Sequence, residues 1–312
     1  MDGVAWSFGK LGDRDRAGRS VSNPIALPPR PEDGHKGTFG TVGIVGGQDN
    51  TDTTMVGAPA LAARAALRIG CGRVMIASPR SIMSEVLGEC LSATGRPLPQ
   101  DGRGELESRG TVLAVASLDA ETDAMAVGPG LGQSLGAVAV VSSLLSAEGP
   151  PLVLDADAIH IVAGLDAVGG WSRHVVLTPH PGEFRVLAEA MGLATPGSDD
   201  DSRREAAIAM SDRLNAVIVL KGHGTVVASG SDVWTSDEGG VELAIPGSGD
   251  VLTGVLAGIL AQLAQSDEAV DVAAAARLAV TTHARAGACW RRERGTRGLL
   301  AEELADRIGL CP

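Results

Sequence analysis

Residues 246–254 have the sequence Pro-Gly-Ser-Gly-Asp-Val-Leu-Thr-Gly and lead directly into an apolar segment, DVLTGVLAGILAQLA (250–264). Apolar side chains lie on nearly all sides of the helix that this segment predicts, which is typical of a buried helix. A glycine-rich turn before a helix lets backbone N–H groups converge on an anion, and the helix N-terminus adds about half a positive charge. The stretch therefore predicts an anion-binding turn attached to a core helix.

Short apolar runs alternate with helix-forming segments ahead of this turn, and most of the runs are continuous. Continuous apolar strands suit a parallel sheet that helices cover on both faces. Strands are expected at 41–47, 73–78, 111–117, 124–130, 151–157, 174–180, 216–222 and 224–229, and helices at 55–70, 134–146, 250–264, 270–290 and 299–309. We expect a tail or linker over 1–34 and one layered α/β domain over 35–312.

The composition agrees with a folded, soluble protein. Of the 312 residues, 44% are apolar and 21% are charged, which supports a sizeable core and excludes a disordered chain. No apolar run is long enough to span a bilayer, and the start of the chain lacks the features of a signal peptide, so we expect a cytoplasmic protein. Its four cysteines are far apart and are expected to be reduced structural thiols.

The charge and the aromatic content limit the ligand. The net charge of −12 disfavours nucleic-acid binding, although backbone N–H groups can still hold a small phosphate. The chain has 42 Gly but only three Phe, four Trp and no Tyr. We therefore expect backbone amides, rather than stacked aromatic rings, to bind a phosphate-bearing ligand.

Two loops each allow a structural and a functional interpretation. Asp250 could cap the helix that follows it, or it could take a proton from a hydroxyl that attacks a phosphate held by the turn. The stretch Lys221-Gly222-His223-Gly224-Thr225 lies between two expected strands. It could be a hairpin turn with a solvated lysine, or it could contact the phosphates or ribose of a nucleotide.

Other unusual residues also follow expected strands. In LTPHPGE (177–183), a helix start explains Pro181 and Glu183, whereas His180 suggests a ligand or magnesium-water site. The loop GPGLG (128–132) suits close approach to a ligand but is a poor match to a dinucleotide fingerprint. We expect Asp157 to cap a helix, and Asp155 is a candidate for positioning a metal or a loop.

Seven segments in order together resemble the ADP- or ATP-dependent NAD(P)H-hydrate dehydratases, a branch of the ribokinase-like fold. They are HKGTFGTVGIVGG, GAPALAARAALRIGCGRV, AVGPGLG, LVLDADAI, LTPHPGE, VLKGHGT and GSGDVLTG, and the likeness covers about residues 34–310. The resemblance implies a three-layer αβα fold with a mostly parallel central sheet. It also implies a repair enzyme that removes water from hydrated NADH or NADPH at the expense of ADP or ATP, with Mg²⁺ as cofactor.

The resemblance also assigns roles to residues of this chain. Asp250 would be the catalytic base and would line the hydrate site together with Ala58, Gly130 and His180. The AMP part would contact Lys221, Gly222, His223, Gly224, Thr225 and Gly249. The anion hole would be Gly247, Ser248 and Gly249, and Glu183 matches a position tied to magnesium. Relatives of this kind are often homo-oligomers, and we expect the epimerase that some carry as a fused domain to be a separate enzyme here.

Two alternatives remain open at this stage. A ribokinase-like kinase of a small alcohol shares GSGD but should lack the HPGE and GPGLG set. A nucleotide-binding protein without turnover is suggested by Glu242, which adds negative charge ahead of the anion hole, and by Pro246, which removes a backbone N–H. The sequence does not choose between ADP and ATP, or between the two hydrates.

Overall fold

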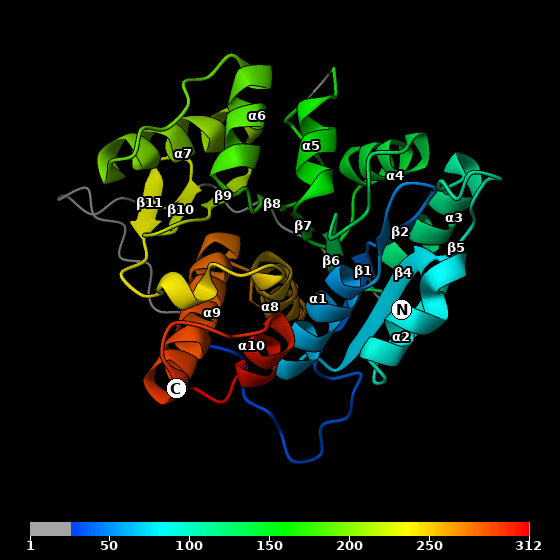
Figure 1. The fold of residues 1–312 in the computed structure, drawn as a ribbon, viewed down its shortest axis with the longest axis horizontal. Helices are drawn as coiled ribbons and strands as arrows, with labels where there is room; N and C mark the ends of the chain where they lie inside the picture. Colours follow the sequence, from blue (N-terminus) through cyan, green and yellow to red (C-terminus); the bar gives the residue numbers. More distant parts are fainter. Residues whose placement is uncertain (1–25, 167, 267, 312) are drawn as a thin grey trace.

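The computed structural model describes residues 26–166, 168–266 and 268–311, which form an open sheet with helices on both faces (Figure 1). The expected tail lies mostly outside the described residues. Its described end is attached to the fold, because Arg30 donates to the carbonyl oxygen of Gly70 at 2.6 Å and lies over the ring of Phe39.

The main sheet has nine strands. They are β1 (Thr41–Val45), β4 (Arg73–Pro79), β5 (Thr94–Leu98), β6 (Ala124–Val127), β7 (Leu152–Leu154), β8 (Val175–Leu177), β9 (Val217–Leu220), β10 (Val226–Ser229) and β11 (Asp232–Thr235). Their order is β11-β10-β9-β8-β7-β6-β1-β4-β5, parallel from β9 to β5 and antiparallel where β10 joins β9 and β11. A separate hairpin pairs β2 (Gln48–Asp49) with β3 (Thr54–Met55).

Helices form a layer on each face of this sheet (Figure 1). The first layer holds α1 (Gly57–Arg68), α2 (Met83–Glu89), α8 (Ser248–Leu263), α9 (Val272–Arg294) and α10 (Ala301–Arg307). The second holds α3 (Ser108–Asp119), α4 (Leu135–Ser146), α5 (Asp157–Ala163), α6 (Pro181–Met191) and α7 (Asp200–Leu214).

Each layer has its own apolar core, and the strands contribute to both. Along β9, Val217 and Val219 pack into the first core, whereas Ile218 and Leu220 pack into the second. Successive side chains of a strand point to opposite faces, so a strand covered on both sides must be apolar throughout. The expected α/β architecture with a mostly parallel sheet is confirmed.

One expected strand is wrong: residues 111–117 lie within α3. Thr111, Val115 and Leu118 are buried, at the spacing of one helix face, whereas Leu113 between them is 63% exposed. The helix begins after Glu107, whose carboxylate accepts hydrogen bonds from the backbone N–H groups of two residues in the first turn. The β-branched residues of this run favour a strand, but the one-sided burial stabilises a helix.

The expectation of four reduced thiols is also wrong, because Cys289 and Cys311 form a disulfide. Cys289 is on α9, and the chain returns to it after α10, which brings the two Cα atoms within 6.4 Å. Cys71 and Cys90 are free and buried, and burial raises the pKa of the Cys71 thiol to about 12. Within the described ranges, no helix is both long and apolar enough to cross a membrane.

Candidate active site at the carboxyl edge of the sheet

The loops after β1 and β6 meet at the point where the strand order reverses. β4 and β5 lie on one side of β1, and β6 lies on the other. The N–H of Gly47 donates to the carbonyl oxygen of Pro129 at 2.9 Å, and a Cβ on Gly46 would lie 2.3 Å from that oxygen. Open parallel sheets bind ligands beyond the carboxyl ends of their strands at such a point, which selects this edge.

Helices α1 and α8 bring their N-termini to the same edge. A Cβ on Gly254 would lie 2.0 Å from the carbonyl oxygen of Ala62, and one on Gly258 would lie 3.0 Å from that of Ala66. Because the contacts advance four residues on both helices, α1 and α8 run parallel. The expected base Asp250 and the expected hydrate-site residue Ala58 lie one turn before these contacts, on α8 and α1 respectively.

Both helix N-termini have the properties of an anion site. Gly247 is the N-cap of α8 at φ +83°, a conformation that favours glycine, and Val56 is the N-cap of α1. Among the described residues, neither N-cap side chain accepts a hydrogen bond from its helix. The first N–H groups of a helix have no acceptor within it, so these two starts can donate to an anion.

Asp250 is the third residue of α8, so it is not the cap that one interpretation of the sequence expected. Burial raises the pKa of this carboxyl to about 7, and the negative charges of Asp155 and Glu183 act in the same direction. The positive charge of Lys221 opposes them. A carboxyl with a pKa near 7 is matched to general acid–base chemistry at neutral pH.

The charged centre of the site is Lys221. Its Nζ lies 2.7 Å from Asp155 Oδ1 and 3.9 Å from Glu183 Oε2. Burial lowers the pKa of Lys221, but the carboxylates of Asp155 and Glu183 outweigh it, and the net pKa is raised. The side chain is 18% exposed, so the interpretation as a solvated hairpin lysine is wrong.

The loop 221–225 is the turn of the antiparallel β9–β10 hairpin, as the sequence predicted. Gly222 and Gly224 adopt φ values of +144° and +65°, and His223 is exposed. Arg203 of α7 holds the loop, because its Nη2 donates to the carbonyl oxygens of Leu220, Lys221 and Gly224 at 3.2–3.4 Å. No local sequence pattern indicates this role of Arg203, because it lies 17 or more residues from the carbonyl groups that it contacts.

His180 has a structural role that the sequence analysis missed. It is the N-cap of α6, and its Nδ1 accepts hydrogen bonds from the N–H groups of Gly182 and Glu183. Glu183 Oε2 in turn accepts from the N–H of His180 at 2.7 Å, which completes a reciprocal capping box. Burial raises the pKa of Glu183, partly offset by Lys221. The imidazole itself remains 56% exposed at the edge of the site.

Ser248 faces the core rather than the anion hole. Its hydroxyl lies 3.1 Å from His283 Nε2, and its N–H donates to the carbonyl oxygen of Ile245 at 3.4 Å. His283 Nε2 also lies 3.0 Å from the carbonyl oxygen of Ser248. Burial lowers the pKa of His283 to about 4, so the ring is neutral and supports the start of α8 from α9. Ser248 and His283 are 35 positions apart, so no local sequence pattern indicates this contact.

The β2–β3 hairpin lies on the GPGLG loop. A Cβ on Gly130 would lie 2.3 Å from Met55 Cγ and 3.3 Å from Ala58 Cβ, so the expected hydrate-site residues Gly130 and Ala58 are neighbours. The N–H of Gly132 donates to Asp157 Oδ2 at 2.8 Å. The expectation that Asp157 caps a helix is wrong, because the N-cap of α5 is Ala156 and Asp157 is the first residue of the helix. Its carboxylate holds the GPGLG loop instead.

Glu242 is buried beside α9. Its side chain is 1% exposed and packs beside Gly240, with one carboxylate oxygen 3.9 Å from Arg291 Nη1. The carboxylate that suggested a protein without turnover thus has the guanidinium of Arg291 as its nearest charged partner.

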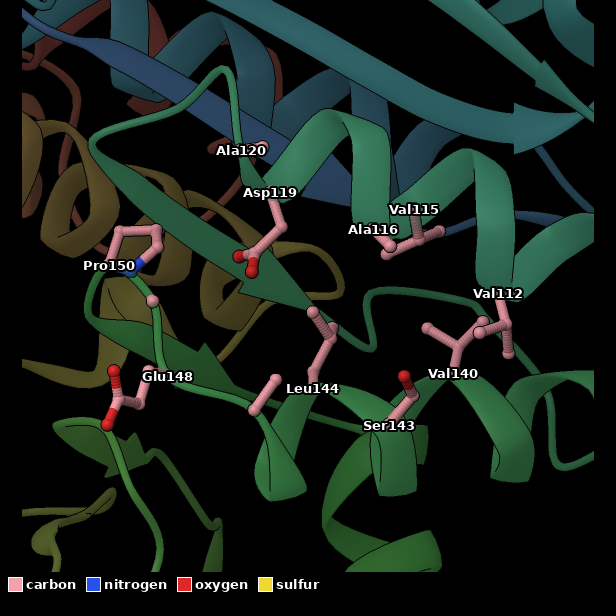
Figure 2. Close-up of a pocket in the computed structure, with 12 residues that line it drawn as sticks. Val112, Val115, Ala116, Asp119, Ala120, Val140, Ser143, Leu144, Glu148 and Pro150 are labelled. Carbon is pink, nitrogen blue, oxygen red and sulfur yellow. The ribbon is translucent and has the colours of Figure 1, made fainter. Parts of the chain in front are cut away.

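A cavity of about 300 Å³ lies elsewhere, between α3 and α4 (Figure 2). Its walls include Val112, Val140 and Leu144, and Asp119 lies at its rim, paired with the buried Arg173 at 2.8–2.9 Å. It lies where α3 and α4 lead into β6 and β7, at the amino ends of these strands. It is thus at the opposite edge of the sheet from Asp250 and plays no part in the candidate site.

The fold and site define a ribokinase-like protein with an uncapped, glycine-rich helix start beside a buried carboxyl of raised pKa. The family model of the NAD(P)H-hydrate dehydratases matches residues 42–309. The chain belongs to this family, as the sequence resemblance indicated.

Individual relatives agree with the family assignment. An ADP-dependent (S)-NAD(P)H-hydrate dehydratase of Neisseria meningitidis is 34% identical over 90% of this chain and 88% of its own length. A bifunctional NAD(P)H-hydrate repair enzyme of Moorella thermoacetica is 36% identical over 90% of this chain and 50% of its own. The chain thus spans about half the length of the bifunctional relatives it matches.

A solved structure agrees as well. The ADP/ATP-dependent NAD(P)H-hydrate dehydratase of Bacillus subtilis, co-crystallised with ATP and Mg²⁺, superposes with a TM-score of 0.70 at 30% identity. The match covers 90% of this chain and 92% of that one. The three-layer ribokinase-like architecture expected from the sequence is confirmed.

Proposed function

We propose that this protein is an ADP-dependent (S)-NAD(P)H-hydrate dehydratase. The observation that carries the proposal is Asp250, a carboxyl with a pKa of about 7 in the first turn of an uncapped helix beside Lys221. The names of the Neisseria meningitidis and Bacillus subtilis relatives support ADP or ATP as the phosphoryl donor.

The proposed reaction has two steps. Asp250 takes the proton of the hydroxyl on the hydrated nicotinamide ring, and the oxygen attacks the terminal phosphorus of ADP, with AMP leaving. The N–H groups of Gly247 and Gly249, at the start of α8, stabilise the charge on the transferring phosphoryl group. The C–O bond then breaks, phosphate leaves, and loss of a ring proton restores NADH or NADPH.

The binding residues are also part of the proposal. Ala58, Gly130 and His180 would line the hydrate site, and Lys221, Gly222, His223, Gly224, Thr225 and Gly249 would contact the nucleotide. The contact of Met55 and Ala58 with Gly130 and the place of Lys221 beside Gly249 support this division. We further propose that residues 35–312 form a single domain and that the protein is a cytoplasmic homo-oligomer.

The charges of the site fit a divalent cation. Three carboxyl groups, Asp155, Glu183 and Asp250, surround one ammonium group, and their mutual repulsion contributes to the raised pKa values of Glu183 and Asp250. No cluster of three metal-ligating side chains occurs in the described part of the chain. This suits Mg²⁺, which is usually held by one or two carboxylates, waters and the phosphates of a substrate. Glu183 would hold it, and it would neutralise charge on the phosphates.

The test is an assay of the purified protein with NADH hydrate, ADP or ATP, and Mg²⁺. We expect the absorbance of reduced nicotinamide to return, with one phosphate released per NADH. Asp250→Asn should lose this activity by several orders of magnitude while keeping its affinity for ADP. Nucleotide binding with no recovery of NADH by the parent protein would refute the proposal, and an active Asp250→Asn variant would refute the assignment of the base.

A further inference from the structure

Asp155 joins the strand ends of the site to the helix that carries the base. It follows β7 and is 1% exposed. Its Oδ1 accepts hydrogen bonds from Thr178 Oγ1 at 2.8 Å and Lys221 Nζ at 2.7 Å, and its Oδ2 accepts one from Thr253 Oγ1 at 2.8 Å. One carboxylate therefore connects the ends of β8 and β9 with α8.

These contacts leave Asp155 little capacity for a metal ion. Both oxygens already accept hydrogen bonds from side chains, and the residue is closed to solvent. A magnesium ligand would need to face the water and phosphate oxygens that complete its coordination. Of the two roles that the sequence suggested for Asp155, the contacts favour the positioning of the chain over the binding of a metal.

The group that Asp155 positions is the ammonium of Lys221. A Cβ added to Gly249 would lie 3.1 Å from Lys221 Nζ and 3.6 Å from Asp155 Oδ2, so the pair lies directly beneath the anion-binding turn. A lysine side chain has many rotamers, and fixing one when a ligand arrives lowers affinity. A charge-assisted hydrogen bond made in advance reduces that cost.

We propose that Asp155 is a positioning residue that holds the Lys221 ammonium against the Gly249 turn, where it meets the phosphates of the nucleotide. The inference rests on the nucleotide site of the proposed function. It does not depend on the hydrate being the second substrate. Asp155 acts through Lys221 and makes no contact with the ligand itself.

The test is a double-mutant cycle on ADP affinity with Asp155→Asn and Lys221→Met, measured by calorimetry on the full chain. Asparagine keeps the shape of aspartate and removes its charge. We expect each single variant to bind ADP roughly tenfold to a hundredfold more weakly. In the Lys221→Met background, Asp155→Asn should weaken binding less than about threefold, because its partner is gone. Fully additive losses would overturn the proposal.

Adenosine separates positioning from a general loss of structure. It lacks the phosphates, so Asp155→Asn should leave its affinity unchanged within about twofold, and an equal loss for adenosine and ADP would overturn the proposal. The double variant should also be more thermally stable than Lys221→Met alone, which leaves a buried carboxylate unpaired. If Lys221→Met does not fold, the adenosine comparison on Asp155→Asn alone decides the question.

Asp119→Asn is the matched control. It breaks another buried carboxylate pair, with Arg173 at 2.8–2.9 Å, at the opposite edge of the sheet. This variant should lower the melting temperature and bind ADP as the parent does. Because all of these readouts are binding or stability, a failure of the dehydratase assay would leave the inference about Asp155 testable by itself.

Discussion

Gly254 of α8 lies against Ala62 of α1 so closely that a Cβ on the glycine would be 2.0 Å from the alanine carbonyl oxygen. The obstacle is backbone, which cannot turn away as a side chain can. This contact sets the distance between the two parallel helices whose N-termini form the candidate site.

Replacing Gly254 with alanine should therefore separate α1 from α8. We expect a loss of about 1–3 kcal/mol in the free energy of unfolding, typical of an overpacked core, and a fall in kcat/KM because the start of α8 moves. Gly88→Ala is the control, since Gly88 lies in α2 and a Cβ there meets nothing within 4 Å. It should leave activity unchanged and raise stability by up to about 1 kcal/mol through helix propensity. Equal stability of the two variants would contradict the argument.

The pKa of Asp250 predicts the pH dependence of the reaction. A general base must be ionised, so kcat/KM for the hydrate at saturating ADP should rise about tenfold per pH unit below pH 7 and level off above it. Rates between pH 5.5 and 8.5 test this, with ADP affinity measured over the same range to separate binding from chemistry. A rate that is flat across pH 7, with constant ADP affinity, would exclude Asp250 as the titrating base.

The same carboxyl links folding to pH. Its pKa is about 7 in the folded protein and 3.8 as the reference value, so between these values the folded state binds the extra proton. Stability therefore falls as pH rises from about 4 to 7. Asp250→Asn removes this loss and should be more stable than the parent at pH 8, by on the order of 2 kcal/mol, with the difference shrinking below pH 7. Urea unfolding at several pH values measures it, and a difference independent of pH would refute the raised pKa.

The disulfide gives a redox prediction. Cys289 and Cys311 are 22 residues apart, and closing a loop of that length stabilises the folded state by about 3 kcal/mol in the chain-entropy model. Cys311→Ser should lower the melting temperature as much as reduction of the parent does, and reductant should have no further effect on the variant. If reductant still lowers its melting temperature, the stabilising bond involves other cysteines.

Much of the fold could be predicted because covered parallel strands leave a simple pattern. Strands such as β9 are apolar at every residue, and only a two-faced sheet needs that. Residues 111–117 were expected to form a strand because several of them are β-branched. They form a helix because only one side of the segment is buried. Secondary structure followed burial there, and burial is set by neighbours distant in sequence.

The site was predictable where the backbone carries the signal, as at Gly247 and Gly249 before an apolar helix. Its side-chain partners were not predictable. Lys221 and Asp155 are 66 residues apart, and Thr253 is 98 residues from Asp155. A local sequence pattern cannot encode pairs that only the strand order brings together. The cap that His180 supplies to α6 was not expected from the sequence, because an imidazole is an uncommon N-cap, and its place in the hydrate site stays a prediction.

The N-termini of α1 and α8, which no side chain caps, have a consequence for evolution. Five other helices, α3, α4, α6, α7 and α9, have side-chain caps from Glu107, Ser134, His180, Asp199 and Asp271. Gly247 leaves no room for such a cap, because its φ is +83° and a Cβ there would lie 2.7 Å from Ala301 Cβ. A serine or aspartate in place of Val56, by contrast, would commonly add about 1 kcal/mol of stability. Such a side chain would occupy the N–H groups that an incoming anion needs. Helices α2 and α5 also lack a capping side chain, so what distinguishes α1 and α8 is that their N–H groups lie at the carboxyl edge of the sheet, where the proposed ligands would complete them.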